Sequence, residues 1–156
     1  VPIASLEELI AYNQRHAAQV MPWFGQEYLE QAAATHGIGD LDYQNARLRL
    51  RKLTREQGID ALLTEHRLDA LIAPTTGPAW KTDWLNGGNY LGGSAGMAAM
   101  AGYPNISLPM GQVHGLPVGL SMFGTAWSEA RLIALAYAFE QRAQARKPPQ
   151  YAETLP

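Results

Sequence analysis

The segment from residue 69 to residue 124 most constrains the fold, because short apolar runs alternate there with glycine- and proline-rich turns. Residues 71–73 predict a buried strand, which Pro74 ends because proline cannot donate a hydrogen bond to a neighbouring strand. Residues 106–109 and 117–123 predict two further strands. Their short connection contains glycine, which favours a hairpin or a pair of close neighbours.

Helical periodicity dominates the chain before this segment. Ser5 and Glu8 form a capping-box pattern ahead of an amphipathic run, and together they predict a helix over residues 6–21. A second amphipathic run predicts a helix over residues 26–35, which the glycines that follow it end.

Three further helices are predicted. Asp40 or Asp42 can cap a long helix that approaches the first strand, and Gly58 is its weak point because glycine is a poor helix former. Residues 92–101 are mostly glycine and alanine, which favours a helix that packs closely against a sheet or a ligand pocket. Apolar spacing over residues 128–146 predicts the last helix, which a pair of prolines stops.

These elements predict one domain over residues 1–156. Residues 1–68 are mainly helical, residues 69–127 carry the strands and pocket loops, and residues 128–146 form the C-terminal helix. About three strands are fewer than a typical sheet of five or six. An edge of such a partial sheet exposes unpaired N–H and C=O groups, so we expect pairing with the rest of a parent chain or self-association with another copy.

Several segments in order carry a resemblance to a known family. They read LDALIAPTTGPAW, AGYPNISLPMG and GLPVGLSMFGTAWSEARLIALAYAFEQ, and together they resemble the C-terminal part of amidase signature family enzymes. The resemblance extends more weakly to SLEELIAYNQRHAAQ and GQEYLEQA. It implies an α/β fold, in which a partial mixed β-sheet is covered by helices as the C-terminal part of an α/β/α architecture.

The resemblance also implies a function for a longer parent protein. Family members cleave carboxamide C–N bonds through an acyl-enzyme, with a serine nucleophile, a second serine on a cis peptide and a lysine base. Those residues precede the region resembled here. The resemblance therefore implies the C-terminal fragment of an amidase that has no catalytic residue and is inactive alone, whose partner is the N-terminal catalytic part and whose substrate is a small amide. No cofactor and no metal are expected.

The loop from Thr75 to Ser94 is the candidate site, because loops at strand ends are where sites are usually built. In similar amidases the stretch before the AGYP-like segment approaches the acyl side of the substrate. The predicted substrate-binding residues are Thr76, Trp80, Asn89, Tyr90 and Ser94. An equal alternative is that Trp80 and Trp84 cap the core while the polar residues satisfy the backbone of turns.

Other catalytic patterns are disfavoured. Residues 92–96 match the letters G-x-S-x-G, but no apolar strand precedes them. His114 is the only histidine after Ser94, and every acidic residue that follows Ser94 comes after this histidine. The chain order of a hydrolase triad is therefore not met after Ser94. The four histidines lack metal-ligand spacing, which favours polar surface roles over a metal site.

The composition of the chain argues against some classes of binding partner. A net charge of −2 and a pI near 6.1 argue against binding nucleic acid. No apolar run approaches the roughly 20 residues that cross a bilayer, so we expect a soluble protein without a membrane partner. The chain has no cysteine, which is compatible with a reducing, cytoplasmic location.

Two alternative functions stay open. One is a non-catalytic binding or assembly module that uses the exposed sheet edge. The other is the A-type component of a tRNA-dependent amidotransferase. Residues 89–101 depart from the asparagine- and leucine-rich pattern expected in that component, which favours the stand-alone amidase.

Overall fold

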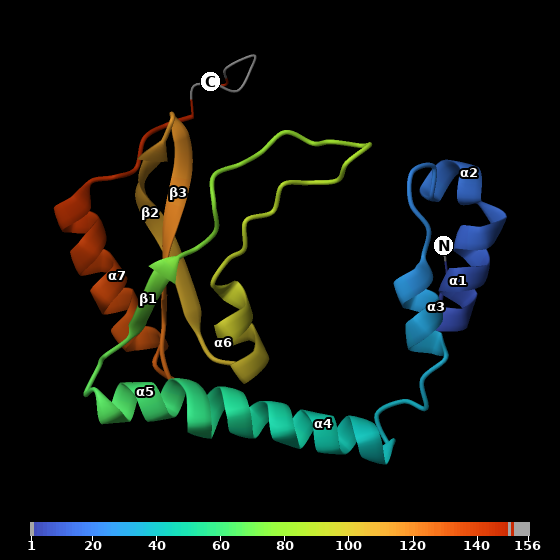
Figure 1. Ribbon diagram of the computed structural model, residues 1–156, viewed down its shortest axis with the longest axis horizontal. Coiled ribbons are helices and arrows are strands. Elements are labelled where there is room, and N and C mark those ends of the chain that lie inside the picture. The colour runs from blue at the N-terminus through green and yellow to red at the C-terminus, as the bar shows by residue number, and fades with distance from the viewer. Residues whose placement is uncertain (1, 150, 152–156) are drawn as a thin grey trace. The chain divides into compact units, whose positions relative to one another are not determined.

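The structure is a computed structural model that describes residues 2–149 and residue 151 (Figure 1). Internal contacts divide the chain into two compact units, with the division after Ala46. Each unit is described by itself. The expectation of one domain over residues 1–156 stays a prediction.

The N-terminal unit is helical. Its first described helices are α1 (Leu6–Arg15), α2 (Ala17–Val20) and α3 (Glu27–Ala33). The predicted helix over residues 6–21 breaks at His16, whose ring stacks on Tyr12 with centroids 4.2 Å apart and whose Nδ1 lies 2.9 Å from the Tyr12 carbonyl oxygen. The predicted cap is confirmed, since the Glu8 N–H donates to Ser5 Oγ at 3.2 Å.

A buried glutamine ties α1 to the start of α3. Gln26 is only 8% exposed to solvent, and its Oε1 accepts a hydrogen bond from Asn13 Nδ2 at 3.0 Å. Its Nε2 donates to the Ile10 carbonyl oxygen at 3.2 Å. Buried polar side chains that find such partners stabilise the packing of two short helices, which would be marginal alone.

The predicted long helix is present, with a change of winding inside it. It comprises α4 (Leu41–Arg51), a π-helical stretch η1 (Lys52–Ile59) and α5 (Asp60–Glu65). Asp40 is the cap, because its Oδ1 accepts the N–H groups of Asp42 at 2.8 Å and Tyr43 at 3.2 Å. Gly58, the predicted weak point, has φ −114° and ψ −106°, outside the helical region.

The predicted strands form a three-stranded sheet in the described part of the chain. The strands are β1 (Leu71–Pro74), β2 (Asn105–Val113) and β3 (Leu116–Phe123), in the order β1-β3-β2. The predicted hairpin of β2 and β3 is confirmed. All pairings among these strands are antiparallel, so the parallel part of the predicted mixed sheet has no counterpart among them. β2 extends past Pro109, which an edge strand tolerates, and an irregularity in register follows this proline.

Helices cover both faces of this sheet (Figure 1). Helix α7 (Glu129–Ala143) packs on one face, and its core residue Leu132 is 1% exposed. On the other face η1, α5 and α6 (Ala95–Ala101) surround Phe123, which is 2% exposed. Ala98 and Ala101 of α6 are buried, as the prediction of a closely packed small-residue helix requires.

A polar network joins the π-helical stretch to the end of α6. Arg55 Nε donates to the Ala101 carbonyl oxygen at 2.5 Å, and its guanidinium lies 5.1 Å from the centre of the Tyr103 ring. The Tyr103 hydroxyl donates to Asp60 Oδ2 at 2.8 Å. Burial raises the pKa of Tyr103, and its hydrogen bond to Asp60 raises that pKa further.

Gly102 ends α6 in the left-handed region, with φ +64°, and a Cβ there would lie 3.1 Å from Arg55 Nη2. We expect Gly102→Ala to cost about 1–2 kcal/mol of stability, which lowers the apparent melting temperature by about 2–8 °C. Gly96 is the matched control, because it lies in α6 and a Cβ added there would meet no atom within 4 Å. Gly96→Ala should raise the melting temperature, since alanine favours helix. Equal shifts in both variants would contradict this account.

The raised pKa of Tyr103 predicts a loss of stability at alkaline pH. Tyrosine in an unfolded chain has a pKa of about 10, so above that pH the folded protein keeps a proton that the unfolded chain releases. The contribution is present below about pH 10 and is lost as the pH rises through the folded-state pKa.

Urea unfolding between about pH 8 and 11 tests this slope, which linkage ties to bound protons. Tyr103→Phe should show a shallower fall in unfolding free energy than the wild type. Tyr137→Phe, which changes a 63% exposed tyrosine, should follow the wild type. An unchanged slope in Tyr103→Phe would mean that this hydroxyl is not linked to folding.

Candidate functional site

The predicted site loop is closed at its base by backbone hydrogen bonds. The Thr75 N–H donates to the Gly119 carbonyl oxygen at 2.7 Å, and the Ser94 N–H donates to the Thr75 carbonyl oxygen at 3.1 Å. Thr76 and Gly93 form an antiparallel bridge one residue further out. Figure 1 shows the loop leaving β1 and returning to α6, so the sheet and a helix fix both ends.

Two of the predicted residues form an aromatic pair within the loop. The rings of Trp80 and Tyr90 have centroids 5.9 Å apart and an interplanar angle of 58°. A Cβ on Gly88 would lie 2.8 Å from Trp80 Nε1, so a side chain there would displace the indole. Trp80 is 38% exposed and Tyr90 65% exposed, which leaves both rings accessible.

The outer turn of the loop is held by Asp83. Its Oδ1 accepts the N–H groups of Leu85 and Asn86, both at 2.9 Å, and its Oδ2 accepts Asn86 Nδ2 at 3.0 Å. These bonds, above all that from the Asn86 N–H, lower the pKa of the Asp83 carboxyl. The carboxylate therefore stabilises a turn, which agrees with the alternative role proposed for the polar residues of this loop.

The other predicted residues occupy different environments. The Thr76 hydroxyl donates to the Gly92 carbonyl oxygen at 3.2 Å and stays exposed. Asn89 is exposed beside Tyr90. Ser94 is only 4% exposed, and its hydroxyl has no hydrogen-bond partner among the described residues. A buried hydroxyl without a partner is unusual, because it loses its bonds to water without replacement.

A cluster of hydroxyls on the sheet was missed by sequence reasoning. Thr75 Oγ1 lies 2.6 Å from Ser107 Oγ and accepts a hydrogen bond from Ser121 Oγ at 3.0 Å. Ser107 and Ser121 are register partners on β2 and β3. Alternation along each strand places all three on the face that carries Phe123. The serine within the apolar run of residues 116–123 was the available signal.

Gly119 makes room for this cluster. A Cβ at that position would lie 2.8 Å from Thr75 Oγ1 and 2.9 Å from Ser107 Oγ. Glycine inside a strand often marks a close approach of this kind. The cluster and the base of the loop are therefore parts of one arrangement, since Thr75 belongs to both.

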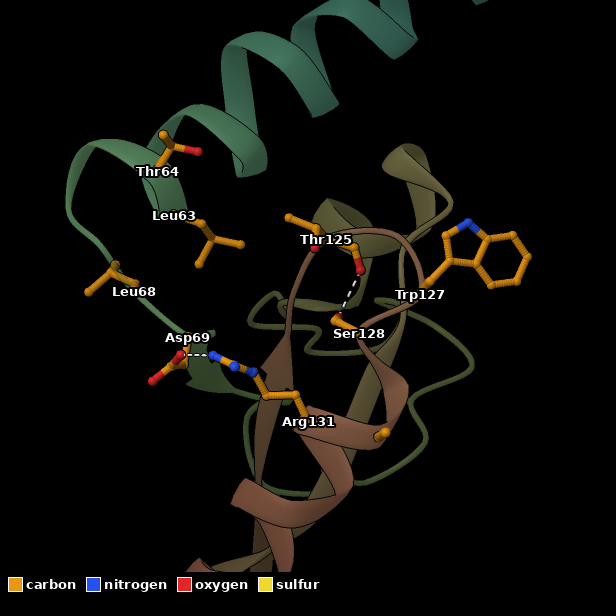
Figure 2. A pocket seen from close by; sticks show the side chains of 9 residues that line it. Leu63, Thr64, Leu68, Asp69, Thr125, Trp127, Ser128 and Arg131 are labelled. Carbon is orange, nitrogen blue, oxygen red and sulfur yellow. Dashed lines mark hydrogen bonds and ion pairs between the residues drawn. The ribbon is translucent and has the colours of Figure 1, made fainter.

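A separate hollow of about 460 Å³ lies between α5 and the turn before α7 (Figure 2). Asp69 and Arg131 form an exposed ion pair at its edge, and Ser128 Oγ donates to the Thr125 carbonyl oxygen at 2.8 Å. Trp127 also lines it, with a positive φ of +63° and 91% exposure. No residue of this hollow was predicted as a site residue.

The described residues show neither a metal-binding group nor a nucleophile turn at Ser94. No group of three or more histidine, aspartate or glutamate side chains is placed to bind a metal in this part of the chain. Residues 86–91 form no strand ahead of Ser94, so the context that a nucleophile turn requires is missing there. Within the same residues, no helix combines the length and apolar character that a bilayer crossing needs.

The sequence of this chain matches a known protein family. The model of the Amidase family matches residues 21–133, which is more than half of the chain. The chain belongs to the amidase signature family, as the sequence resemblance predicted.

Individual relatives are similar over nearly the whole chain. A probable amidase of Arabidopsis thaliana is 36% identical over 96% of this chain and 26% of its own length. The crystal structure of the native peptide amidase from Stenotrophomonas maltophilia is 51% identical, with a TM-score of 0.89, over 99% of this chain and 31% of that one. A structure of the peptide amidase PAM with the competitive inhibitor chymostatin is 52% identical, with a TM-score of 0.92, over 97% of this chain and 31% of that one. The predicted α/β amidase fold is confirmed.

The chain spans only about a quarter to a third of the length of these proteins. More distant similarity reaches the A-type component of the glutamyl-tRNA(Gln) amidotransferase from a Synechococcus strain, at 35% identity over 75% of this chain and 23% of that protein.

Substitution of Gly119 tests whether the hydroxyl cluster is packed as described. Gly119→Ala should lower the unfolding free energy by about 1–3 kcal/mol, because the new methyl group forces the threonine and serine hydroxyls apart. Gly77→Ala is the matched control, since its closest contact would be an ordinary 3.5 Å to Leu91 Cβ. Urea titrations of both variants measure the difference. Equal stability of the two would contradict the close packing at Gly119.

Proposed function

We propose that this chain forms a wall of the substrate pocket in an amidase that hydrolyses peptide amides. The observation that carries the proposal is the loop from Thr75 to Ser94, which is fixed at its base and holds the accessible Trp80–Tyr90 pair. The similarity to peptide amidases at 51–52% identity supports this substrate class.

The reaction would be acyl transfer in two steps. A serine outside this chain attacks the carboxamide carbon, the C–N bond breaks, and ammonia leaves with a proton from the general base system. Water then attacks the acyl-enzyme ester, which releases the carboxylic acid and restores the serine. The residues of this chain bind and orient the acyl side, which lowers the entropic part of the barrier.

The predicted site residues divide these tasks according to their chemistry. Trp80 and Tyr90 offer aromatic surface to a substrate side chain, since aromatic rings bury large apolar areas at low entropic cost. Asn89, which is exposed and precedes Tyr90 in the chain, carries both a donor and an acceptor that match a peptide backbone. Thr76 and Ser94 support the loop from its base.

The free edge of the sheet supports a role as part of a larger protein. Among the described strands β1 pairs only with β3, and Ile72 on β1 is 65% exposed on the face that α7 covers further along the sheet. Strands and helices of an N-terminal catalytic part are the proposed occupants of this edge, because unpaired strands favour pairing. The isolated chain is then inactive, and self-association through β1 is the alternative outcome. A cytoplasmic location stays a prediction.

The A-type component of an amidotransferase is the weaker alternative. It is supported by a relative with 35% identity, whereas the peptide amidase is 51% identical to this chain. The two functions differ in whether the released ammonia leaves or is passed to an acceptor, which residues outside this chain determine.

The proposal is tested with the complete protein that contains this chain and with the isolated 156 residues. The complete protein should release ammonia from N-acylated peptide amides, and the isolated chain should not. Trp80→Ala in the complete protein should raise KM by about tenfold, because about 1.4 kcal/mol of apolar contact is lost.

Trp127→Ala is the matched control, because it removes an indole from the separate hollow and should leave KM unchanged. Hydrolysis by the isolated chain that Ser94→Ala abolishes would overturn the assignment of the nucleophile to another part of the protein. Equal effects of the two tryptophan substitutions would overturn the role of the loop.

A further inference from the structure

We propose that Ser107, supported by Thr75, donates a hydrogen bond to a backbone carbonyl oxygen of the bound peptide substrate. The inference rests on the proposed function and adds a polar recognition site to the aromatic wall. It is carried by the hydroxyl cluster of Thr75, Ser107 and Ser121, to which sequence reasoning assigned no role.

The number of protons in the cluster leaves one O–H group without an acceptor inside it. Three hydroxyls carry three O–H groups, because each serine or threonine has one donor. The cluster contains two hydrogen bonds, one between Thr75 and Ser107 and one from Ser121 to Thr75. Two protons are used, and one donor remains whichever way the first bond runs.

The direction of the bond between Thr75 and Ser107 decides which hydroxyl holds that donor. Ser121 is 1% exposed and its hydroxyl already donates to Thr75 Oγ1. If Thr75 donates to Ser107, the remaining proton is on Ser107, which is exposed. If Ser107 donates instead, the proton is on the half-buried Thr75. A bond accepted from Ser121 polarises the next hydroxyl, so the first arrangement gives Ser107 a strengthened donor.

The chemistry of the cluster fits a neutral acceptor. Its three members are hydroxyls, and the hydrogen bonds among them involve no ionised side chain. A carboxylate or phosphate would leave its charge without a cationic partner, whereas an amide carbonyl needs one or two neutral donors. A peptide-amide substrate carries such carbonyls along its backbone.

Thr75 links the cluster to the base of the loop that carries the aromatic pair. A Cβ on Gly93 would lie 2.7 Å from the Thr75 carbonyl oxygen and 3.1 Å from the Tyr90 hydroxyl oxygen. Thr75 and Tyr90 therefore flank the same glycine at the base of the loop. A peptide whose side chain rests on Tyr90 would then lie near Thr75, the residue that both sheet serines contact.

The competing occupant is a main-chain carbonyl from another part of the enzyme. A double-mutant cycle distinguishes the two, because it measures coupling between a residue and one substrate group. The complete protein and its Ser107→Ala variant are assayed with an N-acetyl tripeptide amide and with analogues in which one backbone carbonyl at a time is replaced by methylene.

Ser107→Ala should lower kcat/KM for the parent substrate by about tenfold, as expected for a neutral hydrogen bond in an enclosed site. It should have no effect on the one analogue that lacks the recognised carbonyl. Ser107→Thr, which keeps the hydroxyl, should retain activity near that of the wild type. Thr54→Val removes a hydroxyl that bonds within α4 and η1, and it serves as the control.

The outcomes separate this inference from the proposed function. Equal losses with every analogue would mean that the hydroxyl supports the enzyme's own structure, and the inference would be wrong while the amidase function stands. A wild-type protein that hydrolyses none of the amides would overturn the function and the inference together. If Ser107→Ala lowers the melting temperature, the test is repeated with Ser107→Cys, which keeps the size of the side chain and weakens the donor. Ser107→Cys should still show the loss that is specific to one carbonyl group. A Ser107→Cys variant without that loss would overturn the inference.

Discussion

The central strand β3 is paired along both edges and covered on both faces, and the other elements of its unit are positioned by it. Leu120 and Met122 point towards α7, while Ser121 and Phe123 point towards α6 and the end of the long helix. Residues 120–124 are all buried. Hydrophobic burial on two sides of one strand fixes its register, because a shift by one residue would exchange the two faces.

That register also places a polar group inside an apolar layer. Ser121 is 1% exposed between residues that contact the core, and its hydroxyl is satisfied through Thr75. A valine there would fill similar space without a hydrogen-bond requirement. The cost of a buried hydroxyl is small when it is bonded, so the cluster delivers polar groups to the base of the loop at little loss of stability.

The sequence predicted the helices and strands better than it predicted the contacts between side chains. The three strands and the glycine-weakened helix follow from apolar runs and from propensity, which are local. The break at His16 coincides with a ring that stacks on Tyr12, and the π-helical winding accompanies the hydrogen bond from Arg55 to α6. Neither contact can be predicted from the spacing of apolar residues.

The candidate site was also predicted only as far as local sequence patterns allow. The loop was predicted because it follows a strand and is rich in polar and aromatic residues, and the structure brings the rings of Trp80 and Tyr90 together within it. The hydroxyl cluster was missed, since Thr75, Ser107 and Ser121 become neighbours only through cross-strand register. A serine in an apolar strand, opposite another serine, becomes informative only once that register is known.

A crystal structure of the complete protein with a bound competitive peptide inhibitor tests the central claim most directly. The account predicts an inhibitor side chain against Trp80 and Tyr90 and an inhibitor carbonyl oxygen within about 3 Å of Ser107 Oγ, the usual length of such a bond. An inhibitor that leaves residues 75–94 untouched, or that lies in the hollow beside Trp127, would contradict it.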